Sequence, residues 1–555
     1  MKTTIIPQIK KIDVIGDSLH LCNFYLSDHI NEMLPIAKEI FDINKKGNAQ
    51  YPINFIKEEM SAESYRISVK KDSINIMATG SKGLMYGLFT LSELGIINDD
   101  IINECEISDE PSLQFRGLSD DISRGAIPTT QTFFNIIKRI ARYKYNTYMP
   151  YIEDVFKFQS IPAWGKYSDS LDKDEWCAII DFAKRYHVEV RPIINLLGHF
   201  DKLTNIKELQ HLALRYPDGT MSHEMDPKNP EVREVIQVML KEIVDCFGEG
   251  IIHCGGDEPI SLTKIFGADE AATLFNQHYQ FVFEELAKLN CKLMMYCDFF
   301  APPWGDYAVD IERVVEIPKG TQFVFWDYAI RDAYPALNGL HNFDLDIYIS
   351  PGSWTWKRLS CDIKTSFFNV KGLLKADNAR SKGMIMSSWA DGGDTLLDYA
   401  WPGVVIGANF CWSPNSDYTY EEFYALYHKS IFGFEYEQAM LLDSIYHHDR
   451  LVNRTHENEF QEEFFKDPAN PITYPLRNEL YKIQEAMVKA KEEIQTLTPL
   501  RNAELFYPLY LTIARVAFLA DKLSNLPDHR LTTIEEGLEY IESTKQLAND
   551  IKTVK

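Results

Sequence analysis

The chain is short of positive charge and has no long apolar run. Its 555 residues include 57 Lys and Arg against 81 Asp and Glu, for a net charge of −24. Nucleic-acid binding needs clustered basic residues that release counterions from phosphates, so this charge argues against nucleic acid and against an anionic membrane surface. No apolar run approaches the length of a membrane span, and the first residues lack the apolar core of a signal peptide. We therefore expect a cytoplasmic protein with a neutral substrate, or an exported protein if a signal has been removed.

Metal-ligand and disulfide patterns are also missing. The nine cysteines are odd in number and scattered, with no CxxC pair. The 14 histidines show no HExxH motif or other paired-ligand spacing. Buried free thiols are the favoured interpretation of the cysteines, and neither a metal ion nor another cofactor is expected.

Between Leu113 and about residue 412, short apolar strands alternate with amphipathic helices. This alternation predicts βα units around a parallel sheet, and eight units in about 300 residues are typical of a TIM barrel. The competing doubly wound sheet has a glycine-rich phosphate loop after its first strand, and this sequence has none there. The predicted fold class is therefore α/β, with a (β/α)8 barrel over residues 112–413. The eight expected strands are Phe115–Leu118, Thr147–Ile152, Glu189–Ile194, Ile251–Cys254, Lys292–Tyr296, Gln322–Trp326, Ile347–Ser350 and Met384–Ser388.

Two regions of different pattern flank this barrel. Residues 1–111 mix strand-like runs with helical runs such as Ile30–Phe41, which predicts an N-terminal α+β domain. Beyond the barrel the periodicity becomes helical, and Thr419 with Glu422 forms a capping box that predicts the start of a helix. Residues 414–555 are expected to form a C-terminal helical region that serves packing or homo-oligomer formation.

The stretch at residues 251–259, Ile-Ile-His-Cys-Gly-Gly-Asp-Glu-Pro, is the most informative in the chain. An apolar strand runs into two glycines and then presents the adjacent carboxylates of Asp257 and Glu258. Burying even one carboxylate costs several kcal/mol unless it is paired, so two neighbours at a strand end indicate chemistry. The alternative is a helix N-terminus, where acidic side chains interact favourably with the helix dipole.

The ends of the other expected strands carry similar side chains. TIM barrels hold their reactive groups at the C-terminal ends of the strands. Each such residue taken singly could be structural, but together they favour an active site in which aromatic rings stack on a saccharide while acids and an arginine bind its hydroxyls. In strand order the residues are Arg116, Asp120, Asp121 and Arg124; Glu153 and Asp154; Asn195 and His199; Asp257 and Glu258; Tyr296 and Asp298; Trp326, Asp327 and Tyr328; Trp354 and Trp356; Trp389 and Asp391.

Several ordered motifs resemble glycoside hydrolase family 20, the β-N-acetylhexosaminidases. His253-Cys-Gly-Gly-Asp-Glu258 matches the family's H-x-G-G-D-E, which is the most specific of these motifs. Phe115-Arg-Gly-Leu118, with Asp121 and Arg124 after it, is similar to the first-strand motif RGLMLDxxR. Weaker matches follow in the right order over about residues 1–413. They are Gly198-His199 to the end of PGH, Asn146 through Asp154 to N…TDD, and Tyr86-Gly-Leu-Phe-Thr-Leu91 to YGLxTL.

The resemblance implies an exo-acting enzyme that removes terminal, non-reducing β-linked GlcNAc or GalNAc with retention of configuration. The acetamido oxygen of the substrate would be the nucleophile and would form an oxazolinium intermediate. Glu258 would be the general acid and base, and Asp257 would orient the acetamide and stabilise positive charge. The resemblance places Asp154 and His199 beside the acid. Arg116 and Asp391 would bind sugar hydroxyls, and Tyr296, Trp326 and Trp389 would form the walls.

The sequence also departs from the family pattern. A tyrosine that holds the acetamido oxygen is expected after the seventh strand, but residues 350–356 read Ser-Pro-Gly-Ser-Trp-Thr-Trp. Trp354 or Tyr328 could take its place. Asn195, Tyr296 and Asp391 stand where the family has Asp, Trp and Glu, which resembles a divergent branch similar to hexosaminidase D-type enzymes. These changes leave open the preference between GlcNAc and GalNAc.

Other functions remain alternatives at this point. The missing tyrosine is compatible with a catalytically lapsed sugar-binding protein, although Asp257 and Glu258 are both present. A β-glycosidase that uses an enzyme carboxylate as nucleophile is a second alternative. It would hold its two acids about 5–5.5 Å apart, usually on separate strands. In the main hypothesis the partners are glycans that contain N-acetylhexosamine.

Overall fold

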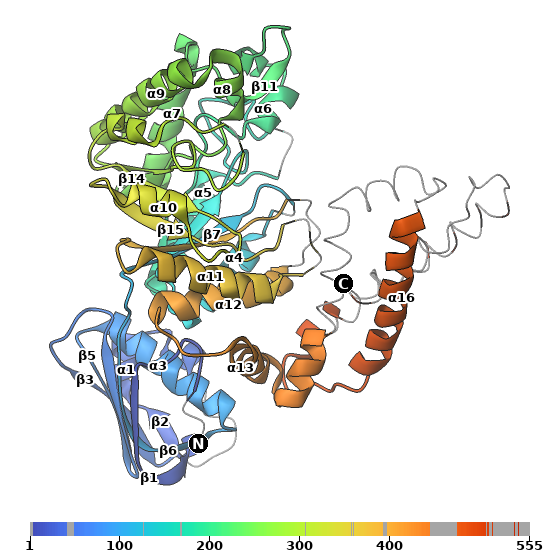
Figure 1. Cartoon of the computed structure of the whole chain (residues 1–555). Coiled ribbons are helices and arrows are strands. Elements are labelled where there is room, and N and C mark those ends of the chain that lie inside the picture. The colour runs from blue at the N-terminus through green and yellow to red at the C-terminus, as the bar shows by residue number, and fades with distance from the viewer. Residues whose placement is uncertain are drawn as a thin grey trace.

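The computed structural model describes residues 4–41, 49–125, 127–166, 169–305, 307–356, 358, 360–391, 397–444 and 474–506, with isolated positions after 507. Three regions follow one another along the chain (Figure 1): a small mixed sheet, a barrel, and helices that extend to one side. Within the described residues, no helix combines the length and the apolar character needed to cross a bilayer. All nine cysteines are free and seven are buried, as the sequence predicted.

The central region is a barrel of eight parallel strands, which confirms the predicted fold class. The strand order is β12-β13-β14-β15-β16-β7-β8-β9, and parallel bridges from Ile193 to both Tyr151 and His253 join the two ends. All strands except the short β9 are largely buried, because helices cover the outside and side chains fill the inside. The strands are β7 (Phe115–Asp121), β8 (Thr147–Tyr151), β9 (Glu189–Val190), β12 (Ile251–His253), β13 (Lys292–Tyr296), β14 (Gln322–Trp326), β15 (Asp346–Ser350) and β16 (Gly383–Ser388).

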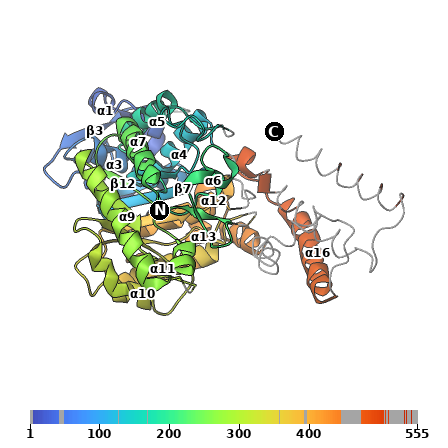
Figure 2. The ribbon, with the colours of Figure 1, turned by 90° about the horizontal axis from the view of Figure 1, so that it is seen from above.

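Helices lie around these strands when the molecule is viewed from above (Figure 2). They lie between successive barrel strands or after the last one, with α8 and α9 both following β12, and neighbouring helices pack on one another. Asp172 begins α5 with a reciprocal capping box to Glu175, and Asn229 caps α7 ahead of Pro230 at its first position. The helices of this layer are α4 (Thr130–Arg142), α5 (Lys173–Arg185), α7 (Pro230–Phe247), α8 (Ile260–Phe266), α9 (Ala268–Lys288), α10 (Pro335–Leu340), α11 (Ile363–Asp377) and α12 (Leu397–Trp412).

The third barrel strand is shorter than the sequence suggested. A strand over Glu189–Ile194 was expected, but β9 ends at Val190 and pairing resumes only at Ile193. Pro192 interrupts the ladder because it has no N–H to donate. Beyond it a two-stranded hairpin, β10 (Ala213–Arg215) with β11 (Met221–Met225), and the short α6 (Asp201–Asn205) extend the loop above the barrel.

The N-terminal region is a six-stranded sheet in the order β1-β6-β4-β5-β3-β2. Helix α3 (Ser81–Ile97) packs on β4, β5 and β6 and also contacts α13, which explains why it is buried nearly all round. The predicted helix over Ile30–Phe41 is instead two short helices, α1 (Asp28–Met33) and α2 (Ala37–Ile40). Pro35 disfavours helical geometry at Leu34 and so separates them. The strands are β1 (Lys11–His20), β2 (Phe24–Leu26), β3 (Tyr51–Lys57), β4 (Tyr65–Lys70), β5 (Ser73–Ala78) and β6 (Ile101–Asp109).

Buried ion pairs join this sheet to the barrel. Arg116 is 1% exposed and donates to both carboxylate oxygens of Glu63, at 3.0 and 2.8 Å. Lys144 lies 3.2 Å from Asp109, whose carboxylate also accepts from the indole N–H of Trp412. Because a buried charge is costly when unpaired, these contacts hold the two regions in one arrangement.

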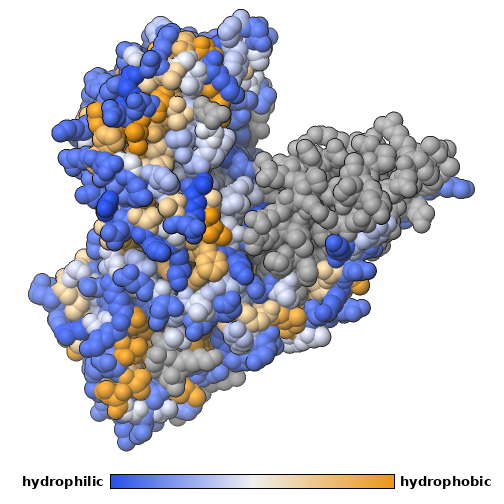
Figure 3. All heavy atoms as spheres, viewed as in Figure 1, coloured by the Kyte–Doolittle hydropathy of each residue, from blue (hydrophilic) through white to orange (hydrophobic). Residues whose placement is uncertain are grey.

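The C-terminal region is helical where it is described. Helix α13 (Tyr420–Phe432) begins at the predicted capping box of Thr419 and Glu422, which is confirmed with both reciprocal hydrogen bonds. Helix α16 (Tyr474–Ile494) lies apart from the barrel in both ribbon views (Figures 1 and 2). On the face shown in Figure 3, apolar patches are small and separated by polar side chains.

Candidate active site

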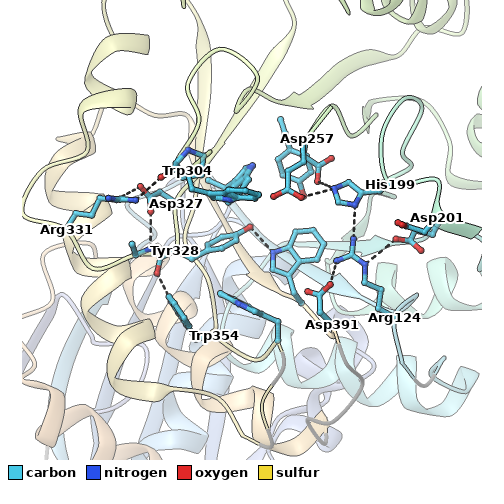
Figure 4. Close-up of a pocket in the computed structure, with 18 of the residues that line it drawn as sticks. Arg124, His199, Asp201, Asp257, Trp304, Asp327, Tyr328, Arg331, Trp354 and Asp391 are labelled. Atoms are coloured by element: carbon cyan, nitrogen blue, oxygen red, sulfur yellow. Dashed lines mark hydrogen bonds and ion pairs between the residues drawn. The ribbon is translucent and has the colours of Figure 1, made fainter. Parts of the chain in front are cut away.

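A pocket of about 780 Å³ lies at the C-terminal ends of the barrel strands (Figure 4). Its lining combines carboxylates, basic groups and many aromatic rings, which is the mixture that the strand ends predicted. The lining residues are Arg124, Glu153, His199, Asp201, Lys202, Asp257, Glu258, Tyr296, Pro303, Trp304, Trp326, Asp327, Tyr328, Ala329, Arg331, Trp354, Trp356, Trp389 and Asp391.

The two adjacent acids follow strand β12 through a glycine turn. Gly255 has φ of 65°, and a Cβ placed there would lie 2.6 Å from Oδ1 of Asn195, so only glycine fits. Glu258 itself has φ of 48°, a conformation that non-glycine residues seldom adopt and that concentrates at functional sites. The following helix α8 begins at Ile260 with no side-chain cap and no acid in its first turn. The helix-capping interpretation of the acid pair is therefore wrong.

His199 connects the acid pair to the rest of the pocket. Its Nε2 lies 3.1 Å from Oδ2 of Asp257 and 3.5 Å from Oε2 of Glu258, while Nδ1 lies 3.3 Å from Nη2 of Arg124. Burial lowers the pKa of His199, but the Asp257 carboxylate overcomes this effect and raises the pKa to about 9. The same pairing holds the pKa of Asp257 below its usual range although burial opposes it. Asp257 is thus kept ionised.

The pKa of Glu258 shifts in the opposite direction from that of Asp257. Burial raises the pKa of its carboxyl, His199 opposes the rise, and the nearby carboxylates of Asp257 and Asp298 add to it, which brings the pKa to about 7. A group with a pKa near neutrality can both give and accept a proton at physiological pH. The pair therefore consists of one carboxylate that stays charged and one carboxyl that can exchange its proton.

One oxygen of Asp257 has no partner. Oδ2 faces His199, whereas Oδ1 is fully buried and accepts no hydrogen bond from any of the described residues. A buried acceptor without a donor costs about 1–3 kcal/mol, and such atoms are rare in folded proteins. Asp257 is among the residues that line the pocket, so its carboxylate is placed where a ligand could supply an N–H donor.

Arg124 forms an ionic cluster at one side of the pocket. Its guanidinium donates to Asp391 at 2.7 Å, to Glu153 at 3.3 Å and to the hydroxyl of Tyr151 at 3.0 Å. Figure 4 shows Arg124, Asp391 and His199 together on this side. Paired charges of this kind present both donors and acceptors, which suits the hydroxyls of a sugar.

Arg116 does not belong to this cluster, and its predicted role in binding sugar is wrong. It is the second residue of β7, so it lies at the N-terminal end of the strand, and it binds Glu63 in the N-terminal region. Arg124 follows the C-terminal end of the same strand and lines the pocket instead. The expected strand Phe115–Leu118 already placed Arg116 near its start and Arg124 beyond its end, so the rule that reactive groups lie at the C-terminal strand ends would have selected Arg124.

Asp154 also lies elsewhere than expected. It is not among the lining residues; its carboxylate accepts from Lys202 at 2.6 Å, and Lys202 reaches the pocket. The preceding residue, Glu153, has φ of 38° and lines the pocket beside Arg124. Of the two predicted supporting residues, the structure therefore places only His199 against the acid pair.

The six aromatic residues predicted at the strand ends all line the pocket: Tyr296, Trp326, Tyr328, Trp354, Trp356 and Trp389. Trp326 and Tyr328 stack with ring centroids 5.0 Å apart, and the indole N–H of Trp389 donates to the Tyr328 hydroxyl at 2.8 Å. The indole N–H of Trp354 donates to the backbone carbonyl of Tyr328 at 2.6 Å. Lys202 and Trp304 had not been singled out from the sequence; Lys202 belongs to the short helix α6, and Trp304 lies in the loop after β13.

Comparison with known proteins agrees with this architecture. Residues 113–297 match the family model described as the catalytic domain of glycosyl hydrolase family 20. The chain is 28% identical over 213 residues to β-hexosaminidase subunit A1 of Dictyostelium discoideum, covering 36% of this chain and 40% of that protein. It is 24% identical over 230 residues to a β-hexosaminidase of Akkermansia muciniphila, covering 36% and 46%. The matched segment thus spans less than half the length of these curated relatives.

Solved structures share the fold over a greater length. The GH20 β-N-acetylhexosaminidase of Streptomyces coelicolor has a TM-score of 0.62 at 17% identity, over 79% of this chain and 96% of that chain. The chitobiase of Flavobacterium johnsoniae has a TM-score of 0.62 at 17% identity, over 93% and 92%. At this level of identity, the solved structures show that the chain shares its fold with these enzymes. The similarity to glycosyl hydrolase family 20 is therefore one of sequence over residues 113–297 and one of fold over a greater length.

Proposed function

We propose that the protein is an exo-acting β-N-acetylhexosaminidase that removes terminal, non-reducing β-linked GlcNAc or GalNAc by a retaining, substrate-assisted mechanism. The observation that carries the proposal is the unpartnered Oδ1 of Asp257 beside Glu258, in a pocket walled by aromatic rings. The N–H of a 2-acetamido group is a donor of the kind that this oxygen needs. A sugar with a 2-hydroxyl in place of the acetamide would not bring that amide to it.

The spacing of the acids supports substrate assistance. An enzyme nucleophile and an acid need to reach the two faces of the anomeric carbon from about 5–5.5 Å apart, which suits residues on different strands. Asp257 and Glu258 are sequence neighbours on one turn. They are better suited to serve two atoms on the same side of the substrate, the acetamido nitrogen and the glycosidic oxygen.

The reaction then runs in two steps. In the first, the acetamido oxygen attacks the anomeric carbon, the bond to the leaving oxygen breaks, and Glu258 gives its proton to that oxygen. Asp257 accepts the amide N–H and stabilises the positive charge of the oxazolinium ring. In the second, Glu258 takes a proton from water, which opens the ring from the other face and retains the configuration.

The relatives support the same class of substrate. The matched proteins of Dictyostelium discoideum and Akkermansia muciniphila are β-hexosaminidases. A β-hexosaminidase of Streptomyces plicatus with the same fold has been solved with GlcNAc as product. In the present chain, Arg124 and Asp391 would bind the hydroxyls at the non-reducing end of the sugar, which accounts for an exo-acting enzyme.

Tyr328 is our candidate to hold the acetamido oxygen. The indole N–H of Trp354 is already used by the Tyr328 carbonyl, so Trp354 is the weaker candidate. The Tyr328 hydroxyl accepts from Trp389 and also has a hydrogen-bond partner in the Ser387 side chain, so the acetamido oxygen would compete with Ser387 for the hydroxyl proton.

Tyr328→Phe is expected to lower kcat for N-acetylhexosaminides by about 10- to 100-fold, the loss of one or two strong hydrogen bonds in the transition state. Steady-state kinetics on an aryl N-acetyl-β-glucosaminide measure this change. Tyr334→Phe is the matched control, since Tyr334 bonds the nearby Ala329 carbonyl without lining the pocket. Equal effects of the two substitutions would remove Tyr328 from this role.

A substrate panel tests the proposed function. The protein is expected to hydrolyse aryl N-acetyl-β-glucosaminide or its C4 epimer, the galactosaminide, and to leave the matching β-glucoside intact. Hydrolysis of the glucoside at a similar rate would favour an enzyme nucleophile. Binding of N-acetylglucosamine, seen by calorimetry, with no hydrolysis of either aminosugar would identify a sugar-binding protein.

A further inference from the structure

We propose that Trp304 is a platform for the leaving group, so that the substrate is a β-linked disaccharide or longer glycan whose second sugar stacks on this ring. The proposal rests on the proposed function and adds a second binding position to it. Trp304 lies at the edge of the pocket and is 52% exposed, which is unusual for so large an apolar side chain. Sugars present an apolar ring face that an exposed indole can cover.

Trp304 is held in place although it is exposed. The carbonyl oxygen of its neighbour Pro303 accepts from Nη2 of Arg331 at 2.9 Å, and Nε of Arg331 donates to Asp327 at 2.7 Å. The loop after β13 is thereby tied to the loop after β14. Gly305, with φ of 84°, makes the tight turn that follows the indole. A fixed ring loses little conformational entropy when a ligand stacks on it.

The same loop is linked to the candidate acid. The indole of Trp304 packs edge-on against Tyr307 with centroids 5.8 Å apart. The hydroxyl of Tyr307 donates to Asp298 at 2.7 Å, and Asp298 also accepts from the backbone N–H of Glu258 at 2.9 Å. One buried carboxylate therefore positions both Glu258 and the residue on which Trp304 packs.

The side of the pocket that would bind sugar hydroxyls lies opposite the side that carries Trp304. Figure 4 shows Arg124 and Asp391 on one side and Trp304, Asp327 and Arg331 on the opposite side. An acid protonates the oxygen that joins the hydrolysed sugar to its leaving group, so the leaving group lies beyond the acid, away from the hydroxyl-binding side. Trp304 occupies that position.

The experiment compares a disaccharide with a substrate that lacks a second ring. Kinetics are measured on the β-1,4-linked disaccharide of N-acetylglucosamine and on methyl N-acetyl-β-glucosaminide. Trp304→Ala is expected to lower kcat/KM for the disaccharide by about three- to tenfold, which corresponds to the loss of one stacking contact. The variant is expected to leave kcat/KM for the methyl glycoside unchanged. Inhibition by free N-acetylglucosamine is expected to be unchanged.

Ile330→Ala is the matched control. Ile330 is also 52% exposed and lies on the adjoining loop, but it does not line the pocket. Ile330→Ala is therefore expected to leave kcat/KM unchanged for both substrates. If Trp304→Ala lowers kcat/KM equally for both substrates, or for neither, Trp304 is not a platform for the leaving group, and the proposed function still stands. If the wild-type protein hydrolyses neither substrate, the proposed function fails and the platform fails with it.

Discussion

Glu258→Gln is expected to lower kcat for N-acetylhexosaminides with poor leaving groups by about 10²- to 10⁴-fold, the usual contribution of a general acid. Glutamine keeps the size of the side chain but has no proton to give. Aryl glycosides whose leaving group is a stable phenolate need little protonation, so they are expected to lose least in the first step. Steady-state kinetics on a series of aryl and alkyl N-acetyl-β-glucosaminides measure the difference. If kcat falls by the same factor for good and poor leaving groups, Glu258 is not the general acid.

The pH dependence of kcat/KM is a second test of the acid role of Glu258. The acid acts in its protonated form, so kcat/KM of the wild-type protein is expected to fall as the pH rises through about 7, the pKa of Glu258. Glutamine does not titrate, and the alkaline fall is expected to disappear in Glu258→Gln. A fall at the same pH in the variant would assign the titration to another group.

Asp257→Asn is expected to lower kcat by about 10²- to 10³-fold, as for the loss of one oriented charge in a buried site. The amide can still occupy the space, but it cannot stabilise the positive charge of the intermediate. It would also leave His199 without its ionised partner, and the pKa of His199 is expected to fall from about 9. NMR titration of His199 follows this change together with the kinetics. Near-normal turnover would contradict the role of Asp257.

The barrel could be predicted because each of its strands is a short apolar run between helices. Strands β13 and β14 have the expected bounds, and the other barrel strands except β9 differ from expectation by a few residues at one end. The failures have local causes. Pro192 removes a donor from the ladder after β9, and Pro35 separates α1 from α2.

The candidate site was predicted where its residues are strand ends and missed where they are not. Asp257 and Glu258 lie on the glycine turn after β12 and His199 lies in the loop after β9, so the rule for barrel enzymes brings them together. Trp304 lies on a loop whose course depends on contacts with Arg331, and no periodicity in the sequence reports such contacts. Arg116 and Arg124 belong to one motif, but Arg116 lies near the start of β7 and pairs with Glu63, whereas Arg124 follows the end of β7 and lines the pocket.

The central claim is that the acetamido oxygen of the substrate, and no side chain of the protein, attacks the anomeric carbon. Aryl β-glucosaminides that carry none, one, two or three fluorine atoms on the acetyl methyl group test it directly, because each fluorine makes that oxygen a poorer nucleophile. We expect kcat/KM to fall steeply with every added fluorine, by orders of magnitude over the series. Rates that do not depend on fluorination would contradict the account.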